Sequence, residues 1–142
     1  MKRIDKDTYY LNIARAVAQR STCLRRHYGA VIVQNDEIVA TGYNGSARGE
    51  VNCCDVFAQC PRKNRAHNSG DYSDCPAVHA EQNALLSASR REMIGASLYL
   101  CGEECVEDEN GEWTYTLIQD ASPCPICQRM INNAGIKKII VF

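Results

Sequence analysis

The chain has 142 residues, of which 45% are hydrophobic and 23% are charged, so we expect one domain spanning residues 1–142 with one compact core. Its 16 Lys and Arg residues nearly balance 17 Asp and Glu residues, and the formal net charge of -1 excludes the strongly basic surface of a general duplex-binding protein. No apolar stretch approaches the roughly 20 residues of a membrane-spanning helix. Because residues 1–10 also lack the apolar stretch of a secretory signal, we expect a cytoplasmic protein with no membrane or nucleic-acid partner.

Nine cysteines are the unusual feature of the composition. In a reducing compartment thiols stay reduced, so clustered cysteines more often bind metal or take part in catalysis than form disulfides. The cysteine content therefore favours metal ligands, with zinc as the first metal to consider.

The first half of the chain predicts a helix followed by a β-hairpin. Apolar residues recur every three or four positions behind Asp5, which predicts a helix that ends near Arg20. Two β-branched runs at 29–33 and 38–41 flank a group of turn residues and predict the hairpin. From 42 to 75 the periodicity stops, and a loop of this length in a compact domain usually needs a function or a metal to order it.

The second half predicts helices alternating with strands. Residues 79–91 are rich in helix formers and predict a second helix, and residues 97–100 predict a third strand. A third helix at 123–134 is closed by Gly135, and residues 137–142 make the final strand. This order predicts an α/β layer sandwich whose later strands are joined by helical crossovers.

Two short segments carry the chemistry, each at the start of a predicted helix. They are His-Ala-Glu at 79–81 and Pro-Cys-Pro-Ile-Cys at 123–127. One imidazole and two thiolates make three zinc ligands and leave the fourth tetrahedral position for water, as in catalytic zinc sites. The ligands are His79, Cys124 and Cys127. Glu81 lies two residues from a ligand, close enough to reach metal-bound water without being a ligand, so it suits proton shuttling.

Each segment alone has a simpler interpretation. The C-x-x-C spacing also occurs in redox sites and zinc ribbons, and His79 alone suits a hydrogen-bonded core histidine. Together and in this order, the two segments match the zinc-deaminase signature H-x-E…P-C-x-x-C.

Two further segments extend the match, namely Gly-Ala-Val-Ile-Val at 29–33 and Gly-Tyr-Asn-Gly-Ser at 42–46. With His-Ala-Glu-Gln-Asn-Ala at 79–84 and the cysteine segment at 123–127, they resemble the deoxycytidylate (dCMP) deaminase family of the zinc-dependent cytidine deaminase superfamily. The resemblance covers nearly the whole chain. It implies a three-layer α/β/α sandwich with a mixed central sheet and helices on both faces, and the hydrolytic deamination of dCMP to dUMP and ammonia.

The resemblance also gives each site residue a role. Glu81 takes a proton from zinc-bound water and delivers it to the ring N3, while the zinc-bound hydroxide attacks C4. Three residues contact the substrate: Asn44 at the deoxyribose, the backbone amide of Ala80 at the pyrimidine carbonyl, and Arg90 at the phosphate. Arg90 also has a simpler interpretation as a solvated arginine at a helix end.

Several dCMP deaminases with a similar cysteine arrangement carry a second, structural zinc near the active site. By position, the resemblance assigns four thiols to a closed site that orders the long loop: Cys23, Cys53, Cys60 and Cys75. His67 and Cys54 are substitute ligands, and a set of buried thiols without metal is the alternative.

Residues 101–122 form a longer segment than most relatives have at this place, and they predict an extra hairpin over the substrate mouth, with Cys101 and Cys105 as ordinary thiols. The resemblance further implies a homo-oligomer and allows dCTP and dTTP as effectors.

Several other functions stay open on the sequence. Another cytosine nucleoside, base or nucleotide is the nearest alternative substrate. A tRNA adenosine deaminase shares the zinc signature but needs a positive surface for RNA, which a net charge of -1 does not supply. A non-catalytic zinc-binding module predicts four protein ligands at each metal and no purpose for Glu81. A thiol oxidoreductase predicts a redox-active dithiol at Cys124 and Cys127.

Overall fold

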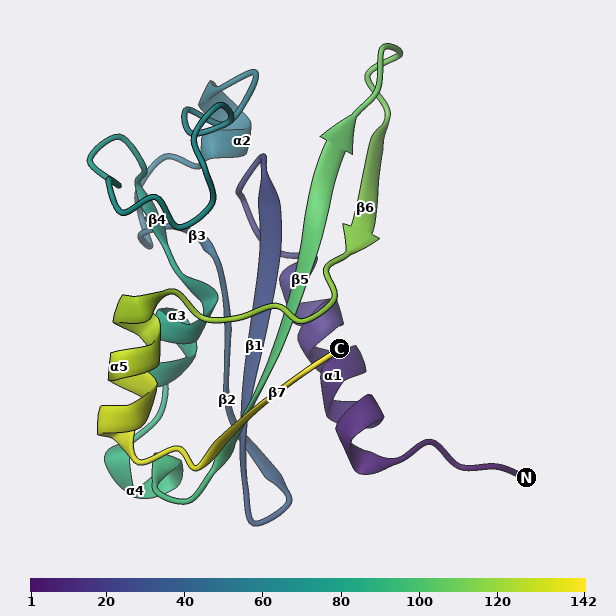
Figure 1. The fold of residues 1–142 in the computed structure, drawn as a ribbon, viewed down its shortest axis with the longest axis vertical. Coiled ribbons are helices and arrows are strands. Elements are labelled where there is room, and N and C mark those ends of the chain that lie inside the picture. The colour runs from purple at the N-terminus through teal and green to yellow at the C-terminus, as the bar shows by residue number, and fades with distance from the viewer.

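A five-stranded mixed sheet forms the centre of the computed structural model, which describes residues 1–142 (Figure 1). β1 (Arg26–Gln34) pairs antiparallel with β2 (Glu37–Tyr43) on one side and with β5 (Ser97–Glu107) on the other. Beyond β5, β6 (Trp113–Leu117) pairs antiparallel with its second half, and β7 (Lys138–Val141) pairs parallel with its first half. The sheet is therefore mixed, as predicted.

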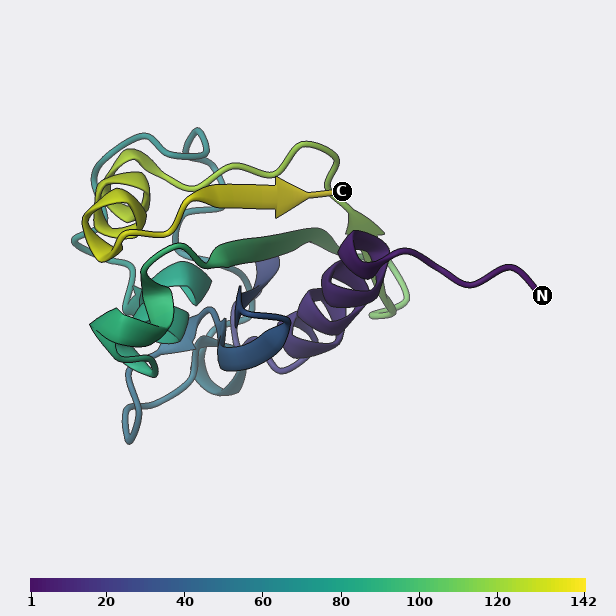
Figure 2. The same ribbon diagram turned by 90° about the horizontal axis from the view of Figure 1, so that it is seen from below.

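Helices cover both faces of the sheet (Figure 2). α1 (Lys6–Ala18) lies on one face, and α3 (Ala80–Leu86) and α5 (Pro125–Ala134) lie on the other. The three-layer α/β/α sandwich is confirmed. No helix in it is both long and apolar enough to cross a membrane.

β1 supplies apolar side chains to the core on both faces of the sheet. Ala30 and Ile32 pack with residues of α3 and α5, whereas Val31 and Val33 pack against α1. Successive side chains of a strand point to opposite faces, so a fully apolar run such as this requires helices on both sides.

The first helix, the hairpin and the last helix follow the sequence prediction. The turn of the hairpin uses Asn35 and Asp36, whose φ angles are 52° and 62°. A two-residue turn with positive φ at both positions matches the twist of the strands that it joins. Gly135 ends α5 with a φ of 87°, a left-handed conformation that a side chain rarely adopts.

The predicted helix at 79–91 is wrong in its length, because the chain breaks it into α3 and α4 (Arg90–Met93). Ser89 caps α4: its hydroxyl accepts from the backbone N–H of Glu92, whose carboxylate accepts from the backbone N–H of Ser89. A serine that bonds the backbone in this way starts a new helix instead of continuing the old one.

The long loop between β2 and α3 is mostly irregular, with three short elements. These are β3 (Gly45–Ser46), α2 (Cys53–Val56) and β4 (Ala77–Val78). β3 pairs antiparallel with β4, which brings the start and the end of the loop together. Asn44 and His79 flank this small sheet and are thus delivered to the same place.

Candidate active site

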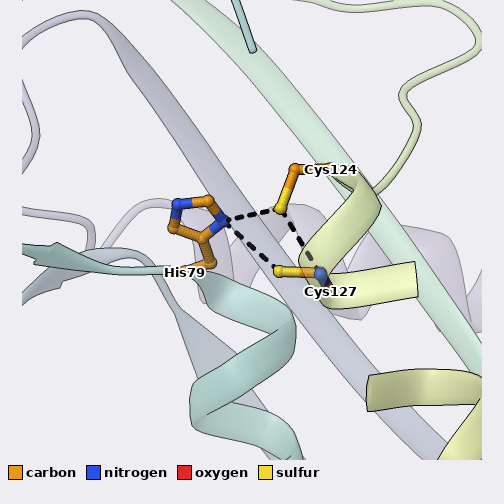
Figure 3. A group of neighbouring side chains, drawn as sticks. All are labelled: His79, Cys124 and Cys127. Atoms are coloured by element: carbon orange, nitrogen blue, oxygen red, sulfur yellow. Dashed lines mark hydrogen bonds between the residues drawn. The ribbon is translucent and has the colours of Figure 1, made fainter. Parts of the chain in front are cut away.

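Three side chains from the starts of two helices point toward one another (Figure 3). The His79 Nδ1 atom lies 3.6 Å from the Cys124 Sγ atom and 3.3 Å from the Cys127 Sγ atom. These three ligand atoms lie within 4.8 Å of one another, and no other group of three or more His, Cys, Asp or Glu residues comes together in this way. One imidazole and two thiols at this spacing fit zinc, with one further coordination position for water.

Helix starts place these ligands. Cys124 is the N-cap residue of α5, where its Sγ accepts from the backbone N–H of Cys127 at 3.4 Å, and Pro125 supplies the first residue of the helix. His79 is the N-cap residue of α3, and its backbone N–H donates to Oε1 of Gln82 at 3.0 Å. The positive end of a helix dipole favours thiolate over thiol.

Burial sets the charge states of the site. Glu81 is only 5% exposed, and burial raises the pKa of its carboxyl group. Burial lowers the pKa of the His79 imidazole and so favours its neutral form, which is the form that binds metal. Burial, with smaller contributions from Glu81 and Cys124, raises the pKa of the Cys127 thiol. Metal binding therefore has to release a proton from this thiol.

A pocket opens beside the three ligands and contains Glu81, Asn44 and Ala80, which the resemblance assigns to the site. The side-chain amide of Asn44 also holds β1: its Oδ1 accepts from the backbone N–H of Tyr28 at 2.8 Å, and its Nδ2 donates to the carbonyl of Arg26 at 2.9 Å. Asn44 thus continues the pairing with β1 directly after β2 ends.

Arg90 lies outside this pocket. It is the first residue of α4, and its guanidinium donates to the carbonyl of Asn133 at 2.8 Å. The structure gives no support to a phosphate contact by Arg90.

Sequence reasoning missed the arginines of the pocket. Three arginines line it, and Glu81 is its only carboxylate. They are Arg25, Arg26 and Arg62. This excess of positive charge favours an anionic ligand. The adjacent arginines at the start of β1 were a usable signal, whereas nothing in the sequence around Arg62 marks it.

The predicted ligands of the second zinc gather at the same pocket. Cys23, Cys60 and Cys75 line it, and Cys53 is buried. Burial raises the pKa of the Cys23 thiol to about 12, with further contributions from the other three thiols, so the four lie near one another. No three of their sulfur atoms reach the spacing of the His79 group.

The two substitute ligands of this second site differ in position. Cys54 is exposed and its thiol contacts Asp55. His67 lines the same pocket as Cys23, Cys60 and Cys75, and its ring stacks on Tyr28 with ring centroids 6.3 Å apart.

The extra hairpin at 101–122 exists, but it does not cover the substrate mouth. Its strands are the second half of β5 and β6, which lengthen the sheet (Figure 1). Only Ser122 of this segment lines the pocket, so the predicted position over the mouth is wrong. The hairpin follows β5 outward because Arg26 of β1 pairs with Glu104 across the sheet and keeps the strands together.

Comparisons with known proteins agree with this geometry. The family model described as the cytidine and deoxycytidylate deaminase zinc-binding region matches residues 4–142. The deoxycytidylate deaminase of Mycobacterium phage D29 is 38% identical over 146 residues, which cover 99% of this chain and 96% of that protein. The deoxycytidylate deaminase of Schizosaccharomyces pombe is 35% identical over 135 residues, which cover 94% of this chain but only 36% of that protein.

A solved structure is similar as well. The dCMP deaminase from the cyanophage S-TIM5, in complex with dCMP and dUMP, superposes with a TM-score of 0.63 at 27% identity. The match covers 98% of this chain and 82% of that chain. From the matched residues, the superposition and the His79, Cys124 and Cys127 geometry, we conclude that the chain belongs to the cytidine and deoxycytidylate deaminase zinc-binding family.

Proposed function

We propose that the chain catalyses the zinc-dependent hydrolytic deamination of dCMP to dUMP and ammonia. The observation that carries the proposal is a single pocket that is lined by two members of the His, Cys, Cys group, by a buried carboxyl group and by three arginines. A pyrimidine nucleotide presents a ring that hydrolysis can attack and, some distance away, an anionic phosphate. The pocket complements both parts, and the phage relatives that act on dCMP support this substrate.

His79, Cys124 and Cys127 would hold the catalytic zinc, because their ligand atoms already lie within 4.8 Å of one another. When bound, zinc supplies Lewis-acid activation of the attacking water. The neutral imidazole of His79 and the N–H that Cys127 donates to the Cys124 sulfur prepare these residues for the ion.

Glu81 moves the protons. Its carboxylate accepts a proton from the attacking water and delivers it to N3 of the cytosine ring, which makes C4 more electrophilic. Glu81 then accepts the remaining proton of the hydroxyl added at C4 and gives it to the C4 amino group, so that the C–N bond breaks, ammonia leaves and the C4 carbonyl forms. Because burial raises the pKa of Glu81 above that of an exposed glutamate, the ionised carboxylate is a stronger proton acceptor.

Backbone and amide groups orient the substrate. The backbone N–H of Ala80 belongs to the first turn of α3, where amides have no partner within the helix, and we assign it to the pyrimidine carbonyl. Asn44 uses one N–H of its amide on Arg26, and we assign the second to the deoxyribose. Both residues line the pocket.

A structural zinc held by Cys23, Cys53, Cys60 and Cys75 is the second part of the proposal. The backbone N–H of Arg62 donates to the Cys60 sulfur at 3.4 Å, the same kind of bond that Cys124 accepts in the catalytic group. Such bonds favour thiolate and therefore metal. Homo-oligomer formation and regulation by dCTP and dTTP stay predictions from the resemblance, and a cytoplasmic location stays a prediction from the sequence.

Ammonia release from a panel of substrates tests the function. We expect the zinc-loaded protein to release ammonia from dCMP faster than from deoxycytidine, CMP, cytosine or adenosine in RNA. A preference for one of the other substrates would replace dCMP in the proposal. If the protein holds its full zinc and deaminates none of these substrates, the non-catalytic zinc-binding module becomes the favoured function.

A further inference from the structure

Arg62 is a buried arginine that has no acidic partner. It is only 5% exposed, and none of the five ion pairs in the structure includes it. Its Nη2 donates to the Ser69 hydroxyl at 2.9 Å, and its guanidinium carbon lies 4.2 Å from the centroid of the Tyr72 ring. Its Nη1 is buried and has no hydrogen-bond partner. A buried charge without a counter-ion is costly, so this position calls for an anion.

The other arginines of the pocket are already engaged. Arg25 donates from Nη1 to the carbonyl of Arg62 at 2.8 Å and from Nη2 to the carbonyl of Arg65 at 2.9 Å. Arg26 pairs with Glu104 at 2.5 Å, so its charge is balanced, although its Nε lacks a partner. Arg25, like Arg62, has no acidic partner, but both of its terminal nitrogens are hydrogen-bonded. Arg62 is thus the pocket arginine that has no acidic partner and also has a terminal nitrogen without a hydrogen bond.

Arg62 is also connected to the proposed metal group through Tyr72. The Tyr72 ring that lies under its guanidinium contacts the His79 ring edge-on, with ring centroids 5.7 Å apart and planes at 70°. Arg62, Tyr72, His79 and Glu81 all line the same pocket. Arg25 fixes the backbone of Arg62 to the start of β1, which holds the guanidinium in place before a ligand arrives.

We infer that Arg62 binds the 5′-phosphate of the substrate and so selects a nucleotide over the corresponding nucleoside. The inference rests on the proposed deamination of dCMP. The flat guanidinium offers paired N–H groups that match phosphate oxygens, and a phosphate supplies the anion that the buried charge lacks. The competing counter-charge is the thiolates of Cys60 and Cys75, which line the same pocket.

Calorimetry on the zinc-loaded protein with dUMP and with deoxyuridine separates these roles. We expect Arg62→Gln to weaken dUMP binding about 10- to 100-fold, the size of a lost hydrogen bond to a charged group, with deoxyuridine binding unchanged. Arg62→Lys keeps the charge without the fork, so we expect an intermediate loss for dUMP. Arg65→Gln is the matched control: Arg65 lies in the same loop, pairs with Asp74 at 2.8 Å and does not line the pocket.

The outcomes that overturn the inference are specific. Equal loss of dUMP and deoxyuridine in Arg62→Gln, or an unchanged ratio of their affinities, leaves Arg62 as a support for the loop alone. If Arg62→Gln binds less zinc than Arg65→Gln, the Arg62 guanidinium balances the charge of the cysteine thiolates and not that of a phosphate. If Arg62→Gln does not fold, the ratio in Arg62→Lys decides. Failure of the wild type to release ammonia from dCMP removes the proposed function, and this turnover assay is independent of the binding measurements.

Discussion

At the scale of single residues, Glu81 is the sharpest test of the chemistry. Glu81→Gln keeps the shape of the side chain but removes the proton acceptor, so we expect zinc content and thermal stability to persist while turnover of dCMP falls about 10²- to 10⁴-fold. Ammonia release and metal analysis on the same preparation measure both. Near-normal turnover would show that another group moves the proton.

The thiols of the catalytic group lend themselves to a second test. Cys124→Ser replaces a thiolate with a hydroxyl, which is a far poorer zinc ligand at neutral pH, so we expect zinc and turnover to be lost together. Cys105→Ser is the matched control, because Cys105 lies on the β5–β6 hairpin and does not line the pocket of the catalytic group. A Cys124→Ser protein with its full zinc content and rate would show that Cys124 is not a ligand.

The residues of the metal group were predictable because their spacing is local. His79 and Glu81 lie at the start of one helix, and Cys124 and Cys127 lie at the start of another, so each pair is set by a single turn of backbone. Arg62 was not predictable in this way. Its burial depends on Arg25, 37 positions earlier, and on the closing of the loop by β3 and β4, which no periodicity in the sequence encodes.

At the scale of elements, contacts between residues far apart in the sequence explain why the length of β5 was predicted wrongly. β5 was expected to end at residue 100 because charged residues follow. In the structure Glu103 is buried beside Arg15, and Glu104 pairs with Arg26 directly across the sheet. Partners on other elements make these charges compatible with a strand. The pattern of apolar residues along one segment contains no information about partners on other elements, so it does not predict this part of the strand.

Asp36 joins two elements, and its charge predicts a dependence of stability on pH. The Asp36 carboxylate accepts from Lys6 at 2.6 Å and from the Tyr10 hydroxyl at 2.7 Å, which ties α1 to the β1–β2 turn. These two bonds, the one from Lys6 first, lower the pKa of Asp36. A carboxyl group with a lowered pKa stabilises the fold above its ordinary pKa, and this contribution is lost as the pH falls through the lowered value.

Asp36→Asn tests this link without disturbing the turn, since asparagine tolerates the φ of 62° at this position. We expect a small decrease in Tm at pH 7 that shrinks at pH 3, because pH 3 lies below the ordinary pKa of an aspartate and the ionised carboxylate there contributes less to stability. Thermal unfolding at the two pH values measures it. A decrease of the same size at both values would assign the effect to shape and not to charge.

At the scale of the whole molecule, the long loop connects catalysis to stability. It starts at Asn44, next to the pocket, and returns to His79, and between them it carries three of the four proposed structural zinc ligands: Cys53, Cys60 and Cys75. The loop has little regular structure of its own. The order of residues 57–76, which contain Arg62 and Tyr72, must therefore come from contacts with the rest of the chain, to which the proposed second zinc would add.

Removing one thiol of this second group should then unfold the loop more than the sandwich. We expect Cys60→Ala to lose one zinc per chain, because a four-thiolate site that loses one ligand binds its metal far less tightly. We also expect protease to cut between residues 61 and 74 and the Tm to fall by more than about 4 °C, which corresponds to roughly 1 kcal/mol in a domain of this size. Turnover should fall less than in Cys124→Ser, through the displacement of Asn44 and Arg62. Metal analysis and limited proteolysis of the wild type, Cys60→Ala and Cys105→Ser decide the question, and a wild type with one zinc per chain would leave these four thiols as buried groups without metal.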